Sequence, residues 1–242
     1  MRRSKLRRTT GLLLLFLCSQ LIICPCASAM TTARKVFCFG DSLTAGTSPP
    51  LNENVPYAPC LEKALRSHYP EHAEILVRWK GYPGWTAQNL GQEGGLGSIM
   101  DNIEQSAGPL DLVIILAGTN DLAYETDSET ITNSIKSVHT IAHGKGVKTL
   151  CLGIPSSGWQ TQSKVTRDLA ESVNSKLKSW ASGGGDENDS TLVEFSPFPI
   201  VSYDNKSRLW CEDGLHLSPE GYRFTGESLA RTVANMLSEE SK

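Results

Sequence analysis

The stretch Val36-Phe37-Cys38-Phe39-Gly40-Asp41-Ser42-Leu43 decides how this chain is read. Four consecutive apolar residues from Val36 to Phe39 predict a strand that is buried on both faces, as strands of parallel sheets are. Gly40 ends the strand, and the polar residues Asp41 and Ser42 follow directly. Because parallel sheets bind their ligands beyond the carboxyl ends of the strands, Ser42 stands where a functional side chain is expected.

Similar apolar runs recur along the chain and alternate with stretches of helical periodicity. Four further strands are predicted at 75–77, 112–117, 147–152 and 191–193, and helices at about 61–65, 128–143, 165–180 and 218–237. Strands that alternate with helices predict one α/β domain with three layers, α/β/α. The expected core is a flavodoxin-like five-stranded parallel sheet of order 2-1-3-4-5.

The first 29 residues have a different composition from the rest. Five basic residues between Arg2 and Arg8 precede an apolar run, Leu12 to Cys24, and Ala27-Ser28-Ala29 follows with small residues at a cleavage-site spacing. This order predicts a secretory signal peptide at 1–29, a single domain at 30–242 and a protein that is secreted or lies in the lumen of the secretory pathway. An uncleaved signal anchor and an internal start at Met30 stay open.

Charge and composition restrict the partners. The whole chain has a formal net charge of −3, and removal of the basic leader makes the remainder more acidic. An acidic protein is poorly suited to nucleic acid or to anionic membranes, so neither is expected as a partner. No cysteine or histidine spacing indicates zinc, and neither a metal nor another cofactor is implied. The oligomeric state is left open.

Chemistry-bearing residues follow the strands one after another. The turn after the first strand holds Ser42, and the second strand is followed by Gly81-Tyr82-Pro83-Gly84-Trp85-Thr86. The third leads into Gly118-Thr119-Asn120-Asp121, and the loop after the fifth ends in Asp213-Gly214-Leu215-His216. The topology therefore collects a serine, a glycine, an asparagine and an Asp/His pair at one edge of the sheet.

These four blocks, in this order, resemble the GDSL or SGNH hydrolases, whose signatures are a GDS serine, a glycine, a GxND asparagine and a DxxH pair. The resemblance extends from Gly40 to His216. The glycine block is the loosest match, because Gly81 competes with Gly84. Gly84 is preferred since Trp85 and Thr86 follow it as a helix begins. No G-x-S-x-G motif is present, which argues against the α/β-hydrolase fold.

The chemistry of these residue types fits a serine esterase. Ser42 is the expected nucleophile, His216 the base that takes its proton, and Asp213 the carboxylate that orients the imidazole. The backbone N–H groups of Ser42 and Gly84 and the Asn120 amide would form the oxyanion hole. Gly84 suits that role because a residue without Cβ permits a close backbone approach.

Competing interpretations apply to several residues. A lone Gly-Asp-Ser-Leu is usually a turn in which Asp41 and Ser42 cap a helix. The other histidines, His68, His72, His139 and His143, lie on or beside predicted surface helices and are expected to be solvated. Asp121 is expected to hold its own loop by hydrogen bonds. Gly94 to Gly97 indicates a flexible loop rather than a nucleotide-binding turn.

The resemblance implies hydrolysis of carboxylic esters through an acyl-enzyme. Short segments between the blocks predict an open site suited to short acyl or acetyl esters, of small molecules or glycans. Trp85, Trp159, Trp210 and Phe198 are candidates to line the substrate pocket, with loop packing as the alternative for each. Carbohydrate O-deacetylase, thioesterase or lysophospholipase, and acyltransferase activities would share the same site. A catalytically silent glycan-binding domain is the non-enzymatic alternative.

Four cysteines remain after the leader. Cys38 and Cys151 fall in strands that the predicted order separates by one strand, about 10 Å, which is too far for a disulfide. Both are expected to be buried free thiols. Cys60 and Cys211 could form a bridge, which secretion would favour. Asn188-Asp189-Ser190 and Asn205-Lys206-Ser207 match the N-glycosylation triplet.

Overall fold

The structure is a computed structural model that describes residues 33–70, 74–92, 94–183 and 192–238. The predicted leader at 1–29, the possible start at Met30, His72 and the triplet at Asn188 lie outside these residues. Within the described part of the chain, no helix combines the length and apolarity needed to cross a membrane.

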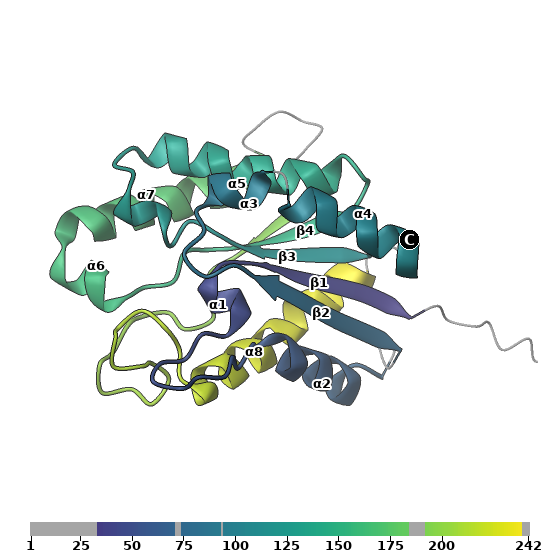
Figure 1. Ribbon diagram of the computed structural model, residues 1–242, viewed down its shortest axis with the longest axis horizontal. Coiled ribbons are helices and arrows are strands. Elements are labelled where there is room, and N and C mark those ends of the chain that lie inside the picture. The colour runs from purple at the N-terminus through teal and green to yellow at the C-terminus, as the bar shows by residue number, and fades with distance from the viewer. Residues whose placement is uncertain (1–32, 71–73, 93, 184–191, 239–242) are drawn as a thin grey trace, which may run out of the picture. The chain divides into compact units, whose positions relative to one another are not determined.

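The sheet has the predicted architecture. Its five parallel strands are β1 (Arg34–Gly40), β2 (Ile75–Gly81), β3 (Leu112–Leu116), β4 (Lys148–Leu152) and β5 (Val193–Ser196), in the order β2-β1-β3-β4-β5. β3 is apolar at every position and fully buried, as a central strand covered on both faces must be. The three-layer α/β/α fold and the order 2-1-3-4-5 are therefore confirmed (Figure 1).

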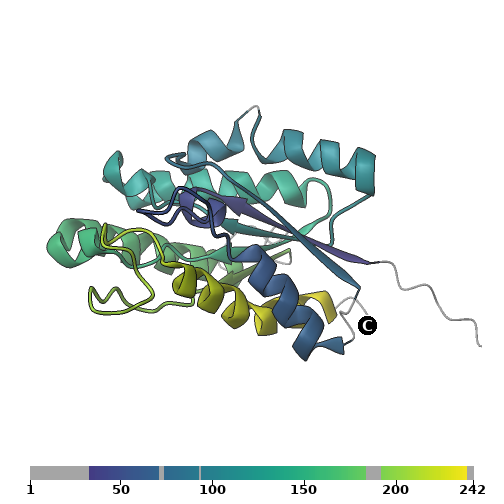
Figure 2. The same ribbon diagram turned by 60° about the horizontal axis from the view of Figure 1, so that its bottom comes forward.

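Helices cover both faces. Helices α2 (Ala58–His68) and α8 (Pro219–Ser238) pack on one face, while α3 (Ala87–Gly91), α4 (Leu96–Ala107), α5 (Ser128–His143) and α7 (Lys164–Ala181) lie on the other (Figures 1 and 2). Three short elements stand near the carboxyl edge: α1 (Ser42–Ala45), the 3-10 helix η2 (Asp121–Ala123) and α6 (Gly158–Gln162). Two apolar clusters, one for each sheet face, form the core.

The strand register lines up the ends that carry the signature blocks. Gly40 pairs with Gly81 on one side and with Leu116 on the other. Leu116 pairs with Leu152, and Leu152 with Ser196. All five strands therefore end at one level, and the segments that follow them start from the same edge of the sheet.

Three expectations about local structure were wrong. The segment expected to be a flexible loop at Gly94–Gly97 contains the start of α4, with Gly95 as its N-cap. The fifth strand begins at Val193, later than predicted. His139 is completely buried, and its Nδ1 lies 2.7 Å from the Thr149 hydroxyl, because α5 turns this side chain toward β4 rather than toward solvent.

The four cysteines among the described residues are free thiols. Cys38 and Cys151 are buried in β1 and β4 as predicted, and burial raises the pKa of each thiol to about 12. The Cys60–Cys211 bridge that the sequence left possible is not formed. Cys211 instead donates to the carbonyl of Leu217, so that its sulfur is directed into its own loop.

Candidate active site

Ser42 begins the short helix α1 directly after β1. Asp41 caps this helix, accepting a hydrogen bond from Leu43 N–H at 2.9 Å. Gly40 is required at the strand end, because a Cβ there would stand 2.2 Å from the Leu116 carbonyl oxygen. This tight turn holds Ser42 at the carboxyl edge, where it is 7% exposed. As the first helical residue, Ser42 has a backbone N–H with no partner inside the helix.

The loop before α8 holds His216 and Asp213 in a closed turn. Cys211 N–H donates to the His216 carbonyl at 2.8 Å, and Trp210 pairs with Leu217 as an antiparallel bridge. The Asp213 carboxylate accepts from the backbone N–H groups of Leu215 and His216, both at 3.0 Å. The Asp213 side chain is therefore fixed relative to the histidine it contacts.

Ser42, His216 and Asp213 form a hydrogen-bonded chain. The Ser42 Oγ lies 2.9 Å from His216 Nε2, and His216 Nδ1 lies 2.6 Å from Asp213 Oδ2. A neutral imidazole with its proton on Nδ1 donates to Asp213 and accepts from the serine hydroxyl. This is the relation of nucleophile, base and orienting carboxylate that serine hydrolases use.

The electrostatics of Asp213 favour its ionised form. Partial burial alone would raise the pKa of its carboxyl group. The hydrogen bonds from the His216 side chain and from the two backbone N–H groups outweigh burial and lower this pKa below its ordinary value. Asp213 is thus a negative charge beside Nδ1 at neutral pH, where it stabilises an imidazolium.

Gly84 lies in the loop that follows β2, between Gly81 and the start of α3. Gly84 has a φ of +81°, but a Cβ added to it would meet nothing within 4 Å. The left-handed backbone is one reason for the glycine, and the close approach to the oxyanion expected from the sequence stays a prediction. Close approach occurs at Gly81, where a Cβ would lie 2.1 Å from the Ala45 backbone nitrogen.

The two residues Asn120 and Asp121 both hold the loop that carries Gly84. Asn120 Nδ2 donates to the Trp85 carbonyl at 2.8 Å. Both carboxylate oxygens of Asp121 accept from the Ala87 N–H, at 3.2 and 3.0 Å, at the start of α3. Asp121 was expected to hold its own loop, and the structure shows that it holds the neighbouring one. No pattern within the Gly118–Asp121 block indicates this partner.

Asp41 is a buried acid directly behind the nucleophile. Its Oδ2 has no hydrogen-bond partner among the described residues. Burial is the largest cause that raises the pKa of this carboxyl to about 7, and the charge of Asp121 adds to it against the Leu43 hydrogen bond. Asp121 also has a raised pKa, chiefly through burial.

The aromatic candidates fall into two groups. Trp85 stacks on Tyr82 with ring centroids 4.0 Å apart, and Trp159 is 54% exposed on α6. Trp210 and Phe198 are buried in the core on the α2/α8 face, so the structure favours loop packing for both. Contact with substrate stays a prediction for Trp85 and Trp159.

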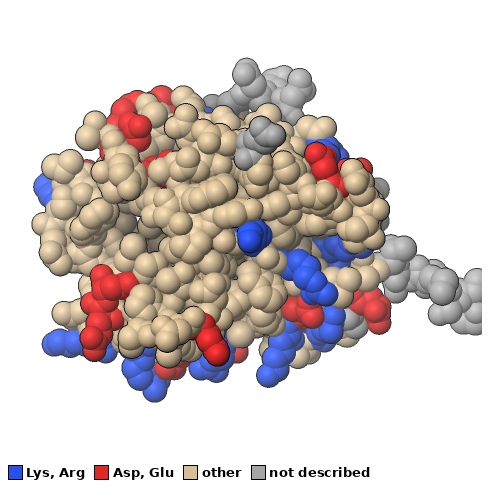
Figure 3. All heavy atoms as spheres, in the orientation of Figure 1, with Lys and Arg blue, Asp and Glu red and all other residues tan. Residues whose placement is uncertain are grey.

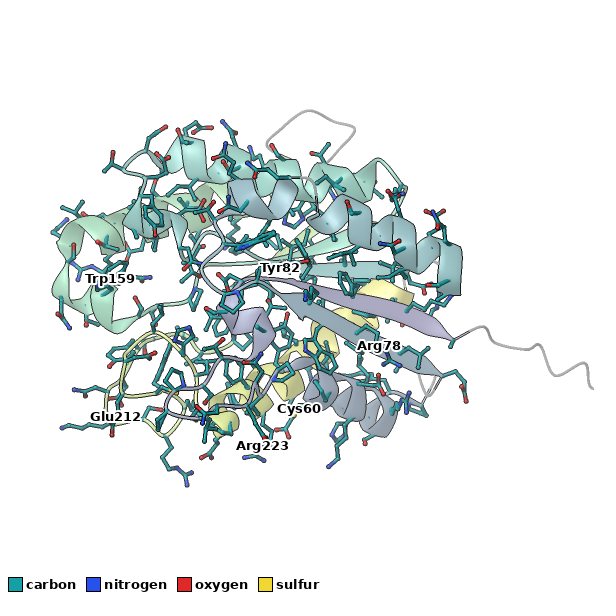
Figure 4. All side chains as sticks on the ribbon, in the orientation of Figure 1. Cys60, Arg78, Tyr82, Trp159, Glu212 and Arg223 are labelled. Carbon is teal, nitrogen blue, oxygen red and sulfur yellow. The ribbon has the colours of Figure 1, made fainter. Side chains whose placement is uncertain are left out.

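A small hollow lies next to the Asp213 turn. It has a volume of about 220 Å³ and is lined by Trp159, Gln162, Tyr203, Glu212 and the turn from Asp213 to Leu215. Figure 4 shows Trp159 on α6 and Glu212 on the loop that precedes α8. No group of three or more His, Cys, Asp or Glu side chains in the described ranges could hold a metal ion.

Comparison with known proteins gives the class of this site. Residues 38–224 match the model of the GDSL-like lipase/acylhydrolase family. The chain belongs to this family and is an SGNH-type carboxylic ester hydrolase. No curated protein matches the sequence significantly.

Solved structures with the same fold include several esterases. Est24, a carbohydrate acetylesterase from Sinorhizobium meliloti, is 24% identical with a TM-score of 0.60, over 84% of this chain and 99% of its own. An inhibitor-bound aryl esterase from M. smegmatis gives 24% and 0.60, over 84% and 100%. The psychrotrophic esterase EstA from Pseudoalteromonas sp., inhibited by monoethylphosphonate, gives 14% and 0.60, over 84% and 98%. These similarities establish the fold.

Proposed function

We propose that this protein is a serine esterase that cleaves short acyl or acetyl esters through an acyl-enzyme on Ser42. His216 Nε2 takes the hydroxyl proton as Ser42 Oγ attacks the ester carbonyl carbon. It then returns the proton to the leaving alcohol oxygen as the ester C–O bond breaks. A water molecule, deprotonated by the same nitrogen, releases the acyl group as a carboxylic acid. The observation that carries this proposal is the Ser42–His216–Asp213 hydrogen-bond chain.

The oxyanion would bind between three donors: the N–H groups of Ser42 and Gly84, and the Asn120 amide. One hydrogen of the Asn120 Nδ2 is engaged by the Trp85 carbonyl, which fixes the amide plane and leaves the second hydrogen for the substrate. Donors fixed before the reaction stabilise the developing charge without reorganising, and each contributes roughly 3 kcal/mol.

A labelling experiment tests the nucleophile. A fluorophosphonate probe should attach to Ser42, because an activated serine attacks phosphorus as it attacks a carbonyl carbon. The related esterase EstA is itself inhibited by a phosphonate. Ser42→Ala should lose both labelling and ester hydrolysis. The matched control is Ser48→Ala, since Ser48 is also buried but contacts Cys211. Labelling that persists in Ser42→Ala would refute the assignment.

Glycan esters are the second candidate substrates. The hollow beside Asp213 combines an exposed indole with the polar groups of Gln162, Tyr203 and Glu212. Aromatic faces and hydrogen-bonding side chains are what a sugar ring requires, and Est24 is a carbohydrate acetylesterase.

A panel of p-nitrophenyl esters of rising chain length, acetylated xylan and a thioester ranks the substrates. If glycan esters are the substrate, Trp159→Ala should raise KM for acetylated xylan and leave p-nitrophenyl acetate unchanged. Equal effects on both would exclude a sugar subsite there.

Secretion through removal of residues 1–29 is part of this proposal. An esterase that acts on exposed glycans needs to reach them outside the cell. Sequencing the amino terminus of the protein isolated from culture medium would check the cleavage site.

A further inference from the structure

On one face of the edge strand β2, the described helices do not pack directly against the strand. Ile75 and Val77 face α2 and are buried, whereas Leu76, Arg78 and Lys80 point to the opposite face and are exposed. On that opposite face α4 packs against α5 and stands apart from β2 (Figure 2). A gap is therefore left between α4 and the outer part of the sheet.

This gap is a groove of about 490 Å³. The sheet contributes Phe37 and Leu76, and α4 contributes Ile99 and Ile103 from above. The volume is in the range of about 300–1,000 Å³ that holds small molecules. The four residue steps from Leu76 to Lys80 advance by about 13 Å along the strand. The groove thus extends along the strand and is mainly apolar, which suits an extended alkyl chain.

The charged residues of the groove all have one sign. Lys35, Arg78 and Lys80 line it, and none of the described Asp or Glu residues does. Lys35 Nζ donates to the Ala107 carbonyl at the end of α4, and Lys80 Nζ lies 4.9 Å from the centre of the Tyr82 ring. Arg78 also lies 3.5 Å from Glu62, which is outside the lining. Lys and Arg side chains gather over β1 and β2 on this face (Figure 3).

We infer that this groove binds a free fatty acid, with the alkyl chain on Phe37, Ile99 and Ile103 and the carboxylate at Arg78 and Lys80. The positive charge of the groove residues favours an anion. This cluster of cations is a local feature, because the whole chain has a negative net charge. The apolar floor between α4 and the sheet argues for a hydrocarbon chain. The site is distinct from the ester-cleaving site, since Arg78 lies within β2 and away from the nucleophile turn (Figure 4).

Calorimetric titration of dodecanoate into the Ser42→Ala protein tests the inference. That variant removes the nucleophile, so the outcome does not depend on the proposed catalytic mechanism. Dodecanoate should bind saturably with one molecule per chain. Dodecyltrimethylammonium, which has the same chain and the opposite charge, should bind at least tenfold more weakly. Equal affinity for the two, or no saturable dodecanoate binding, would overturn the inference.

Two variants locate the site. The double variant Arg78→Gln, Lys80→Gln should weaken dodecanoate binding at least tenfold. The control is the double variant Lys63→Gln, Lys178→Gln, which removes the same charge from exposed residues of α2 and α7 and should not weaken binding. Ser106→Trp, at an exposed α4 position on the groove, should block binding by filling it. Circular dichroism verifies that each variant is folded. Binding that survives both groove variants refutes the site. The inference is also overturned if sedimentation velocity shows that the only effect of dodecanoate is to convert a dimer of this chain into monomers.

Discussion

Asn120 and Asp121 are neighbours in the sequence and act on the same loop from two sides. Asn120 holds the Trp85 carbonyl, and Asp121 holds the Ala87 N–H two residues further along. Gly84 stands immediately before these two anchor points. The position of the Gly84 N–H therefore depends on Asp121, although that residue has no direct contact with Ser42 in the proposed mechanism.

Removal of the Asp121 carboxylate should lower kcat more than it changes KM. In Asp121→Ala, the start of α3 loses its acceptor, Gly84 shifts, and part of the roughly 10²–10³-fold contribution of one oxyanion donor is lost. Asp121→Asn keeps one carbonyl acceptor and should recover much of the rate. Steady-state kinetics with a p-nitrophenyl ester provide the measurement.

Asp127→Ala is the matched control for this experiment. Asp127 also accepts backbone N–H bonds at a helix start, but at α5 and in an exposed position. Its loss should cost about 1 kcal/mol of stability as a helix cap and leave kcat unchanged. If both variants lose kcat equally, Asp121 acts only on stability.

Residues that belong to a local motif could be predicted, and residues whose setting depends on distant contacts could not. The Asp213–His216 spacing closes a turn by itself, and the structure brings this pair to Ser42 as expected. Trp210 lies in an equally local loop, yet α8 and the Tyr203 ring bury it. Nothing near Trp210 in the sequence indicates that contact. Catalytic roles for all these residues stay predictions.

At the scale of elements, the strands were easier to predict than the helices. Apolar runs such as Leu112–Leu116 are short and continuous, and they allow one interpretation. Helix α4 was missed because glycines at 94, 95 and 97 suggested a loop. The signal was present, since Leu96, Ile99, Met100 and Ile103 have helical spacing. Gly95 serves as the N-cap, a position where glycine is acceptable.

The contact between α5 and β4 contains a polar cluster inside the core. Thr149 of β4 lies 2.7 Å from His139 Nδ1 and 2.8 Å from His143 Nε2. Burial, with a smaller contribution from His143, lowers the pKa of His139 to about 3. His139 therefore stays neutral in the folded state at pH values where the unfolded chain protonates it. Its contribution to stability is lost as the pH falls from about 6.5 toward 3.

Thr149→Val should lower the free energy of unfolding by about 1–3 kcal/mol, because it leaves His139 Nδ1 buried without its hydroxyl partner. Urea denaturation at pH 7 measures the loss. Thr140→Val removes a hydroxyl of the same kind from the exposed face of α5 and should change stability little. Similar losses in the two variants would mean that the buried cluster makes no special contribution.

At the scale of the whole sheet, β2 is an edge that the molecule protects against self-association. Glu62 of α2 accepts from the Val77 N–H at 2.7 Å, and Arg66 donates to the Ile75 carbonyl at 2.6 Å. The two side chains also pair with each other at 3.1 Å. They therefore occupy outward backbone groups that another strand would otherwise use.

The double variant Glu62→Ala, Arg66→Ala should associate or aggregate at concentrations where the parent protein does not. Without these side chains, β2 presents an unpaired N–H and an unpaired carbonyl beside exposed Leu76 and Trp79. Sedimentation velocity over a tenfold concentration series at equal ionic strength measures the change. Lys164→Ala, Asp168→Ala removes an ion pair of the same i,i+4 spacing from α7, away from any strand edge, and should leave sedimentation unchanged. An increase in both variants would attribute association to lost surface charge, and no increase in the first would show that the β2 edge needs no protection.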